Sequence, residues 1–353
     1  LPGFDDACVL RACPAPSAPA PVIFRGDDDG FVVDEIPAYL PCGEGEHLYL
    51  FVEKRGVSTP ALIKRALDRF HLHERDVGVA GRKDERGVTR QWISLPARSV
   101  PDPTLLEGDG VRVLEHKRHK NKLRLGHLRG NRFTIRLACD PAVVDGAAAR
   151  VAGGVPNIFG MQRFGPSDST LRQAEQLLAR GRPARSRKDE FLVSAAQSAL
   201  FNRWLADRVD DGTWRTPLDG DVLLKTENGA PFVCTDPSAD GARAVAGDVV
   251  VAGPLLGREM RSAERDAMTR ESRSWSHLGI DVTALLAHPA FDKGARRAAC
   301  LHPGELVIDA EGDAVSVRFS LPKGAYASVV LRALFGAGLV DAAFLERAGD
   351  GGG

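Results

Sequence analysis

Strand-like residue patterns lie toward both ends of the chain, the last of them followed by a helical segment at 326–335, whereas the longest helical patterns lie between them. Residues 47–53 (HLYLFVE) and 88–95 (VTRQWISL) are rich in aromatic and β-branched side chains, and 315–321 (VSVRFSL) alternates apolar with polar residues. Residues 169–180 and 189–209 instead repeat apolar side chains at helical spacing. This order predicts an α+β fold in which the first and last segments share one sheet and the middle is an insertion.

Length and composition fit a folded protein of two domains. The chain has 353 residues, against a typical ~150 per domain. Its 43% hydrophobic and 27% charged residues argue against disorder over the whole chain. No stretch reaches the roughly 18 apolar residues of a membrane span, so we expect no membrane partner. Residues 1–20 lack a signal-peptide pattern and predict a flexible leader, and 346–353 predict a flexible tail.

The six cysteines are scattered along the chain, which predicts free thiols in the cytoplasm rather than a disulfide scaffold. Cys8 and Cys13 are close in sequence, but no histidine pair lies near them, so we predict no metal site. The motifs GxxxxGK[ST], HExxH and GxSxG are absent, and no GxGxxG follows a strand and opens a helix. We therefore expect no metal, nucleotide or redox cofactor.

Residues 112–136 form a basic block within a chain of zero net charge. The block contains nine Lys or Arg residues and a single acid, Glu115. Such a segment can hold an anionic partner, and the alternative is a solvated positive face. Glycines in 126–133 (GHLRGNRF) would let the backbone approach a phosphate. Phe133 among these cations is the pairing used to bind single-stranded nucleic acid, although it could equally be a core strand residue.

The sharpest candidate for chemistry is Asp84, in the polar loop 81–87 (GRKDERG) between the strand-like segments 77–80 and 88–95. Neighbouring cations, among them Lys83, favour the ionised form of its carboxylate. An ionised aspartate on a loop held between strands can act as a nucleophile or as a base. The alternative is a solvated salt-bridge loop that carries no chemistry.

A helix is predicted shortly before this loop. Thr59 suits the N-cap position and Pro60 the first helical position. Leu62, Ile63, Ala66, Leu67 and Phe70 then recur at helical spacing.

Several blocks of sequence together resemble one known family. Residues 80–92 (AGRKDERGVTRQW) are similar to its glycine–x–lysine–aspartate loop followed by threonine and glutamine, and 119–133 (HKNKLRLGHLRGNRF) to its KLRxGxLxGNxF stretch. Further blocks that match the family lie at 43–56, 154–165, 191–202 and 321–332. From about Phe24 to about Phe335, the chain therefore resembles the TruD family of tRNA pseudouridine synthases.

The resemblance implies a pseudouridine synthase fold, which is a mixed, largely antiparallel sheet flanked by helices, with an α+β insertion special to the family. The catalytic domain would be discontinuous, over residues 21–156 and 302–345, and the insertion domain would span 157–301. This division agrees with the shared sheet expected from the strand patterns. The family default also implies a monomer.

The resemblance further implies roles for individual residues. Asp84 falls on the family's catalytic aspartate. The substrate-binding positions fall on Arg25, Lys83, Thr89, Gln91, Asn131 and Phe133. Within the basic block, we assign contacts with the RNA backbone to Arg118, Lys120, Lys122 and Arg124. The chain departs from the family at Ala333, where a glutamate is common.

The implied reaction isomerises uridine to pseudouridine in tRNA, at uridine 13, after the base has flipped out of the RNA. Asp84 would either attack C1′ of the ribose or remove the C2′ proton, and both routes stay open. The alternative function is a non-catalytic RNA-binding or RNA-chaperone protein on the same scaffold, which would bind RNA without forming product. A hydrolase is a weaker alternative, since no second carboxylate is placed for it by sequence.

Overall fold

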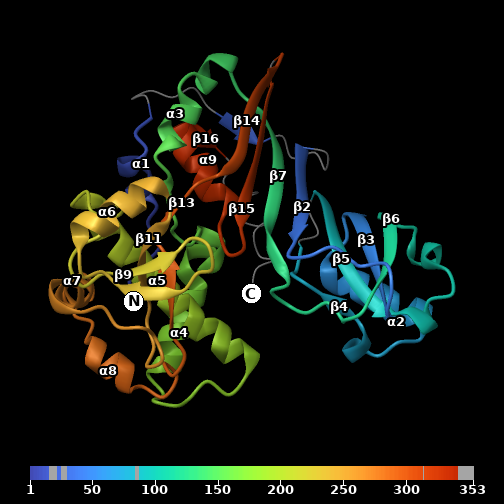
Figure 1. The fold of residues 1–353 in the computed structure, drawn as a ribbon, viewed down its shortest axis with the longest axis horizontal. Coiled ribbons are helices and arrows are strands. Elements are labelled where there is room, and N and C mark those ends of the chain that lie inside the picture. The colour runs from blue at the N-terminus through green and yellow to red at the C-terminus, as the bar shows by residue number, and fades with distance from the viewer. Residues whose placement is uncertain (16–21, 25–29, 84–86, 313, 341–353) are drawn as a thin grey trace. The chain divides into compact units, whose positions relative to one another are not determined.

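Figure 1 shows the fold as a computed structural model, which describes residues 1–15, 22–24, 30–83, 87–312 and 314–340. The chain divides into two compact units. The unit that we call the helix-rich unit comprises Leu1–Pro16, Ala149–His302 and Val329–Gly336. The unit that we call the large-sheet unit comprises Ser17–Ala148, Pro303–Ser328 and Ala337–Gly353.

A ten-stranded sheet forms the large-sheet unit, with seven strands in the order β14-β15-β7-β2-β5-β3-β6. Neighbours in this order run antiparallel except β2 and β5, which are parallel. The strands are β1 (Val22–Phe24), β2 (Phe31–Pro37), β3 (His47–Arg55), β4 (Gly78–Val79), β5 (Val88–Pro96), β6 (Val111–His119), β7 (Leu128–Ala138), β14 (Gly304–Glu311), β15 (Ala314–Pro322) and β16 (Leu339–Val340). Because β15 pairs with β7, an early and a late segment share one sheet, which confirms the predicted α+β fold.

Helix α2 (Thr59–Phe70) packs against one face of this sheet. Of the five apolar side chains predicted to recur on this helix, Leu62, Ala66 and Phe70 are buried in a core cluster with residues of β3 and β5. The other two, Ile63 and Leu67, are partly buried and pack against the same cluster. Burial of a large side chain of this kind contributes roughly 1.5–3 kcal/mol. The helix therefore anchors the half of the sheet that leads into the loop containing Asp84.

The N-cap of α2 is Ser58 rather than the predicted Thr59, so that prediction was wrong by one residue. The Ser58 side chain accepts a hydrogen bond from the amide of Ala61. Thr59 is instead the first helical residue and is completely buried. Its hydroxyl is therefore available for contacts in the interior, which are described with the site below.

Eight further α-helices and six further strands lie in the described residues. The helices are α1 (Ala7–Ala12), α3 (Ala147–Ala152), α4 (Ser169–Leu178), α5 (Arg187–Asp210), α6 (Pro237–Ala246), α7 (Arg265–Ser276), α8 (Val282–Ala287) and α9 (Ala327–Phe335). The strands are β8 (Val155–Pro156), β9 (Val222–Lys225), β10 (Pro231–Val233), β11 (Val249–Leu255), β12 (Ala295–Ala298) and β13 (Cys300–Leu301). A second sheet has the antiparallel order β10-β9-β11-β12, and β8 pairs with β13.

The long helix α5 is the central element of the helix-rich unit. Its predicted apolar stripe is confirmed, since Val193, Ala196, Leu200 and Trp204 are all buried. Among the described residues, no helix has both the length and the apolar character needed to cross a membrane.

The start of the chain differs from the loose leader expected over residues 1–20. Helix α1 contacts α5 and β8, and it buries Cys8 and Val9, with Cys13 buried just beyond it. Arg11 forms an ion pair with Asp210 at 2.5 Å. A short apolar face thus folds residues 1–15 onto the helix-rich unit. Residues 16–20 and the expected tail at 346–353 lie outside the described residues, and the insertion limits 157–301 stay a prediction.

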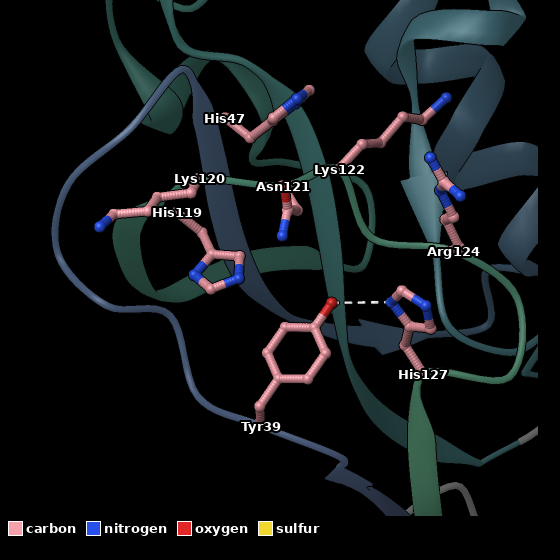
Figure 2. A pocket seen from close by; sticks show the side chains of 8 residues that line it. All are labelled: Tyr39, His47, His119, Lys120, Asn121, Lys122, Arg124 and His127. Atoms are coloured by element: carbon pink, nitrogen blue, oxygen red, sulfur yellow. Dashed lines mark hydrogen bonds between the residues drawn. The ribbon is translucent and has the colours of Figure 1, made fainter.

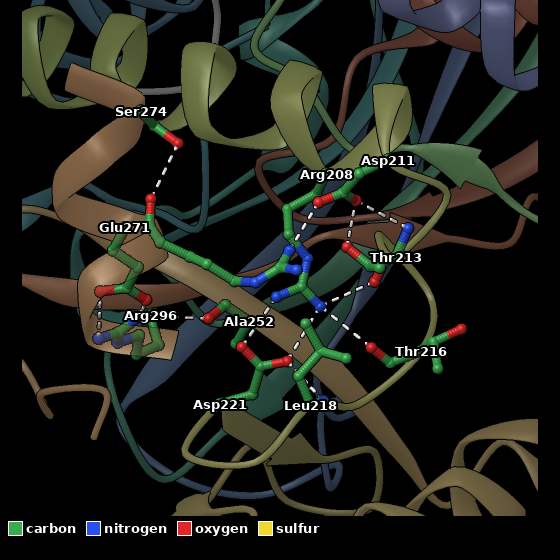
Figure 3. A network of polar contacts seen from close by, with 11 residues as sticks. Arg208, Asp211, Thr213, Thr216, Leu218, Asp221, Ala252, Glu271, Ser274 and Arg296 are labelled. Carbon is green, nitrogen blue, oxygen red and sulfur yellow. Dashed lines mark hydrogen bonds and ion pairs between the residues drawn. The ribbon is translucent and has the colours of Figure 1, made fainter. Parts of the chain in front are cut away.

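A buried ion pair links the end of α5 to the chain before β9 (Figure 3). Arg208 donates hydrogen bonds to both carboxylate oxygens of Asp221 at 2.9 Å, and to the carbonyls of Thr213 and Thr216. Both charged side chains are almost fully buried, at 3% and 4% exposed. Removing one partner of such a pair leaves the other charge buried and unpaired, which is costlier than losing an exposed pair.

We predict that Asp221→Asn lowers the free energy of unfolding by about 3–5 kcal/mol. The matched control is Asp207→Asn, which breaks the partly exposed Arg203–Asp207 pair on the same helix and should change stability by no more than about 0.5 kcal/mol. Chemical denaturation of both variants measures the difference. Equal effects of the two substitutions would contradict this assignment.

Candidate active site and nucleic-acid interface

A row of paired residues runs across five neighbouring strands of the large sheet. Thr89 of β5 pairs with Lys54 of β3 on one side and with Val33 of β2 on the other. Val33 pairs with Phe133 of β7, which in turn pairs with Phe319 of β15. Paired residues point to the same face of a sheet, so Thr89 and Phe133 share one face, about 10 Å apart across β2.

The next row on the same face contains the other expected strand residues. Gln91 and Asn131 lie two positions from Thr89 and Phe133 on their strands, and strand side chains alternate between faces. Asn131 pairs directly with Glu35 of β2. The register therefore brings together four of the predicted substrate-binding positions and adds Glu35, which sequence reasoning missed.

Lys83 enters this site as the partner of a buried carboxylate. Its Nζ lies 3.3 Å from Oε2 of Glu35, and the other oxygen of Glu35 accepts a hydrogen bond from the amide of Trp92. Lys83 is 7% exposed and Glu35 4%. Burial raises the pKa of Glu35, and the nearby Lys83 ammonium opposes this shift. Lys83 thus has a buried carboxyl partner, and the signal for it was an acid at an inward position of β2.

The backbone of Lys83 is fixed from both sides by buried polar groups. Thr59 Oγ1 accepts a hydrogen bond from the Lys83 amide at 2.7 Å and lies 3.0 Å from its carbonyl oxygen. Lys54 Nζ also donates to this carbonyl, at 3.3 Å. The Thr59 hydroxyl lies 2.8 Å from Gln91 Oε1, so its single proton can satisfy Gln91 while Lys54 satisfies the carbonyl. We call Lys54, Thr59 and Gln91 the loop anchor.

Asp84 follows directly on this anchored residue, but Asp84 itself and Arg25 lie outside the described residues. The far end of the loop is fixed at Gly87, which has a φ of +81°. A Cβ at this glycine would lie 2.4 Å from the carbonyl oxygen of Phe31, so no other residue fits there without a shift. Both ends of the loop that contains Asp84 are therefore set by the sheet.

Phe133 is a largely buried member of an aromatic row, at 9% exposed. Its ring stacks on Phe319 with centroids 5.6 Å apart and lies 6.4 Å from Phe31. Asn131 Oδ1 and Thr89 Oγ1 are buried and lack a hydrogen-bond partner among the described residues. Both polar atoms lie on the sheet face that carries Phe133.

The basic block forms the edge strand β6 and the connection to β7, and it lines a pocket of about 700 Å³ (Figure 2). The pocket is lined by Tyr39, His47, His119, Lys120, Asn121, Lys122, Arg124 and His127. It includes Lys120, Lys122 and Arg124 of the four residues expected to contact the RNA backbone, whereas Arg118 is not among its lining residues.

Two imidazoles in this pocket are biased toward the neutral form. Burial lowers the pKa of His47, and Lys122 adds to this effect while Glu46 opposes it. Burial and then Lys120 lower the pKa of His119. At neutral pH the pocket thus combines cationic side chains with uncharged rings. Within the described residues, no group of three His, Cys, Asp or Glu side chains could hold a metal ion.

The large mixed sheet and its flanking helices have a counterpart among solved structures. The fold is similar to a crystal structure from Methanosarcina mazei described as a putative tRNA pseudouridine synthase D (TruD), with a TM-score of 0.72 and 21% identity. The similarity covers 91% of this chain and 95% of that one.

Sequence comparison identifies the particular family. The model of tRNA pseudouridine synthase D (TruD) matches residues 18–187 and 184–334. The tRNA pseudouridine synthase D of Anaeromyxobacter sp. (strain Fw109-5) is 44% identical over 89% of this chain and 92% of its own length. That of a Thermus thermophilus strain is 37% identical over 87% of each chain. The chain belongs to the TruD family, which confirms the resemblance seen in its motifs.

We predict that Thr59→Val frees the amide of Lys83, because valine keeps the shape of threonine but cannot accept this amide. The backbone amide of residue 59 still donates to the Lys83 carbonyl in this variant. Leaving this buried donor unpaired should cost about 1–3 kcal/mol of stability. Hydrogen–deuterium exchange should report faster exchange of the peptide that contains Lys83. Thr59→Ser keeps the hydroxyl and serves as the control, with exchange near that of the wild type. Unchanged protection in Thr59→Val would show that the hydroxyl does not anchor the loop.

Proposed function

We propose that this chain converts uridine to pseudouridine in tRNA, at uridine 13, with Asp84 as the catalytic residue. Membership of the TruD family supports the reaction and the class of RNA. The motif around Asp84 supports the choice of aspartate, and the position in tRNA rests on the family resemblance alone. The observation that carries the proposal is that the Lys83 backbone is hydrogen-bonded at both its amide and its carbonyl.

This anchoring bears on catalysis because Asp84 is the next residue in the chain. Consecutive Cα atoms are about 3.8 Å apart, so a fixed Lys83 restricts where the Asp84 side chain can begin. Catalytic groups contribute most when they are held close to their reactive geometry before the substrate arrives. Lys54 and Thr59 act here as positioning residues, since they contact Lys83 directly, and Gln91 supports them through the Thr59 hydroxyl.

In the proposed reaction, the N1–C1′ bond of uridine breaks, the uracil turns, and a C5–C1′ bond forms. The proton on C5 is lost and N1 gains one, so the product is an isomer of the substrate. Asp84 either adds to C1′ and leaves again, or removes the C2′ proton and returns it. The flipped base costs a few kcal/mol to extract from the RNA, and contacts of the basic block with phosphates offset this cost.

A second candidate is an RNA-binding or RNA-chaperone function without catalysis, favoured by the basic pocket of Figure 2. The intact lysine–aspartate motif at 83–84 argues for the enzyme instead, because a binding protein has no need of an ionised aspartate at that position.

We predict that Asp84→Asn abolishes pseudouridine formation in a tRNA transcript while the dissociation constant for tRNA stays within about threefold of the wild type. Loss of the charge removes the nucleophile or base but keeps the shape of the side chain. Glu85→Gln, which removes a charge from the same loop, should retain activity. Release of tritium from C5-labelled uridine measures turnover. Turnover by Asp84→Asn would refute the catalytic assignment, and a wild-type protein that binds tRNA without turnover would favour the chaperone.

The target position has a separate test. A transcript in which uridine 13 is replaced by cytidine should yield no pseudouridine, because the other uridines would not reach the site. Chemical mapping of pseudouridine by primer extension gives the position directly. Product at a different uridine would overturn the assignment of position 13 without affecting that of Asp84.

A further inference from the structure

The pocket in Figure 2 contains an aromatic ring that is held in place and partly exposed. The Tyr39 ring stacks on His119, with centroids 5.1 Å apart, and meets His127 edge-on. Its hydroxyl lies 2.7 Å from Nδ1 of His127 and 3.4 Å from the hydroxyl of Tyr49. Tyr39 nevertheless remains 36% exposed. A ring fixed by three neighbours loses little entropy when a further ring stacks on it.

The charged groups around this ring are suited to a phosphate. Lys122 and Arg124 lie on the same side of the pocket in Figure 2, and neither forms an ion pair with a described carboxylate. Lys122 donates only to the exposed backbone carbonyl of Arg75 among the described groups. Lys120 pairs with Glu44 at 2.7 Å, but both side chains are exposed. An aromatic platform beside cations without a carboxylate partner is the arrangement that binds a nucleotide, through its base and its phosphate.

This pocket differs from the place where the reacting uridine is expected. Tyr49, which contacts Tyr39, and Lys54 of the loop anchor lie five positions apart on β3, so they point to opposite faces of the sheet. The two places are nevertheless linked through the backbone. The amide of Gly126, in the connection that lines the pocket, donates to the carbonyl of Ala80 at 2.8 Å. Ala80 lies three residues before the anchored Lys83.

We propose that this pocket binds a nucleotide of the tRNA other than the uridine that reacts, with its base on Tyr39 and its phosphate on Lys122 and Arg124. The inference rests on the proposed function, in which tRNA is the substrate. The pocket is a second contact on the same unit as the loop that contains Asp84. It fixes the RNA relative to that loop, so it contributes to binding and not to the chemical step.

Tyr39→Ala tests this contact. Loss of one stacked base should raise KM for full-length tRNA about tenfold, while kcat stays within about twofold. Tyr39→Phe keeps the ring but loses its hydrogen bond to His127, so its KM should lie much nearer the wild type than that of Tyr39→Ala. Leu40→Ala, at an exposed neighbouring side chain, should also have no effect. Arg124→Gln should weaken binding and lower the salt dependence of the affinity by about one phosphate contact. Wild-type affinity in Tyr39→Ala would overturn the proposal.

A second measurement identifies the nucleotide and separates this proposal from the proposed function. Binding is measured in the Asp84→Asn background, with and without Tyr39→Ala, to tRNA that is intact or abasic at the reacting position. If the pocket holds another nucleotide, Tyr39→Ala weakens binding of both RNAs by the same factor. If only the intact RNA is affected, the pocket holds the reacting base and the proposal is wrong. Because no turnover is measured, the result stands whatever the role of Asp84.

Discussion

The geometry of the site depends on how the backbone of Lys83 is held. Thr59 accepts its amide proton, Lys54 donates to its carbonyl oxygen, and Gln91 completes the chain of contacts through the Thr59 hydroxyl. The Lys83 side chain points inward as well, to Glu35. The amide, the carbonyl and the side-chain ammonium of Lys83 are thus all hydrogen-bonded within the protein. A loop held in this way has little conformational freedom at Lys83, and the proposed catalytic aspartate is the next residue.

The sheet explains why these contacts can form between distant parts of the chain. The parallel pairing of β2 with β5 puts Val33 beside Thr89, and the antiparallel pairing of β2 with β7 puts Val33 beside Phe133. A shift of register by one residue would turn each strand's site residues to the other face. Gly130 protects this register, because a Cβ there would lie 1.9 Å from the carbonyl oxygen of Leu321 on β15. The late segment of the chain thus contributes to the site by fixing β7.

Sequence patterns predicted what depends on local order and missed what depends on contacts between distant segments. The alternation of β5 correctly placed Thr89 and Gln91 on one face, since it needs only neighbouring residues. The partnership of Lys83 with Glu35 joins residues 48 positions apart, and no local pattern encodes it. The glycines of 126–133 were expected to let the backbone approach a phosphate. Gly130 instead allows the close pairing of β7 with β15. The charged loop pointed to Asp84 and the family motif gave it a role, whereas Arg25 rests on the resemblance alone. Both lie outside the described residues, and their roles are proposals.

The central claim is that the anchored loop presents the carboxylate of Asp84 to the sugar of a flipped uridine. The structure of the Asp84→Asn variant bound to tRNA tests it most directly. The account predicts that a side-chain oxygen at position 84 lies within about 3.5 Å of C1′ or of the C2′ hydrogen of the reacting uridine, as near-attack geometry requires. It also predicts that the Lys83 amide keeps its bond to Thr59. A bound uridine whose ribose lies on the opposite face of the sheet, away from residue 84, would contradict it.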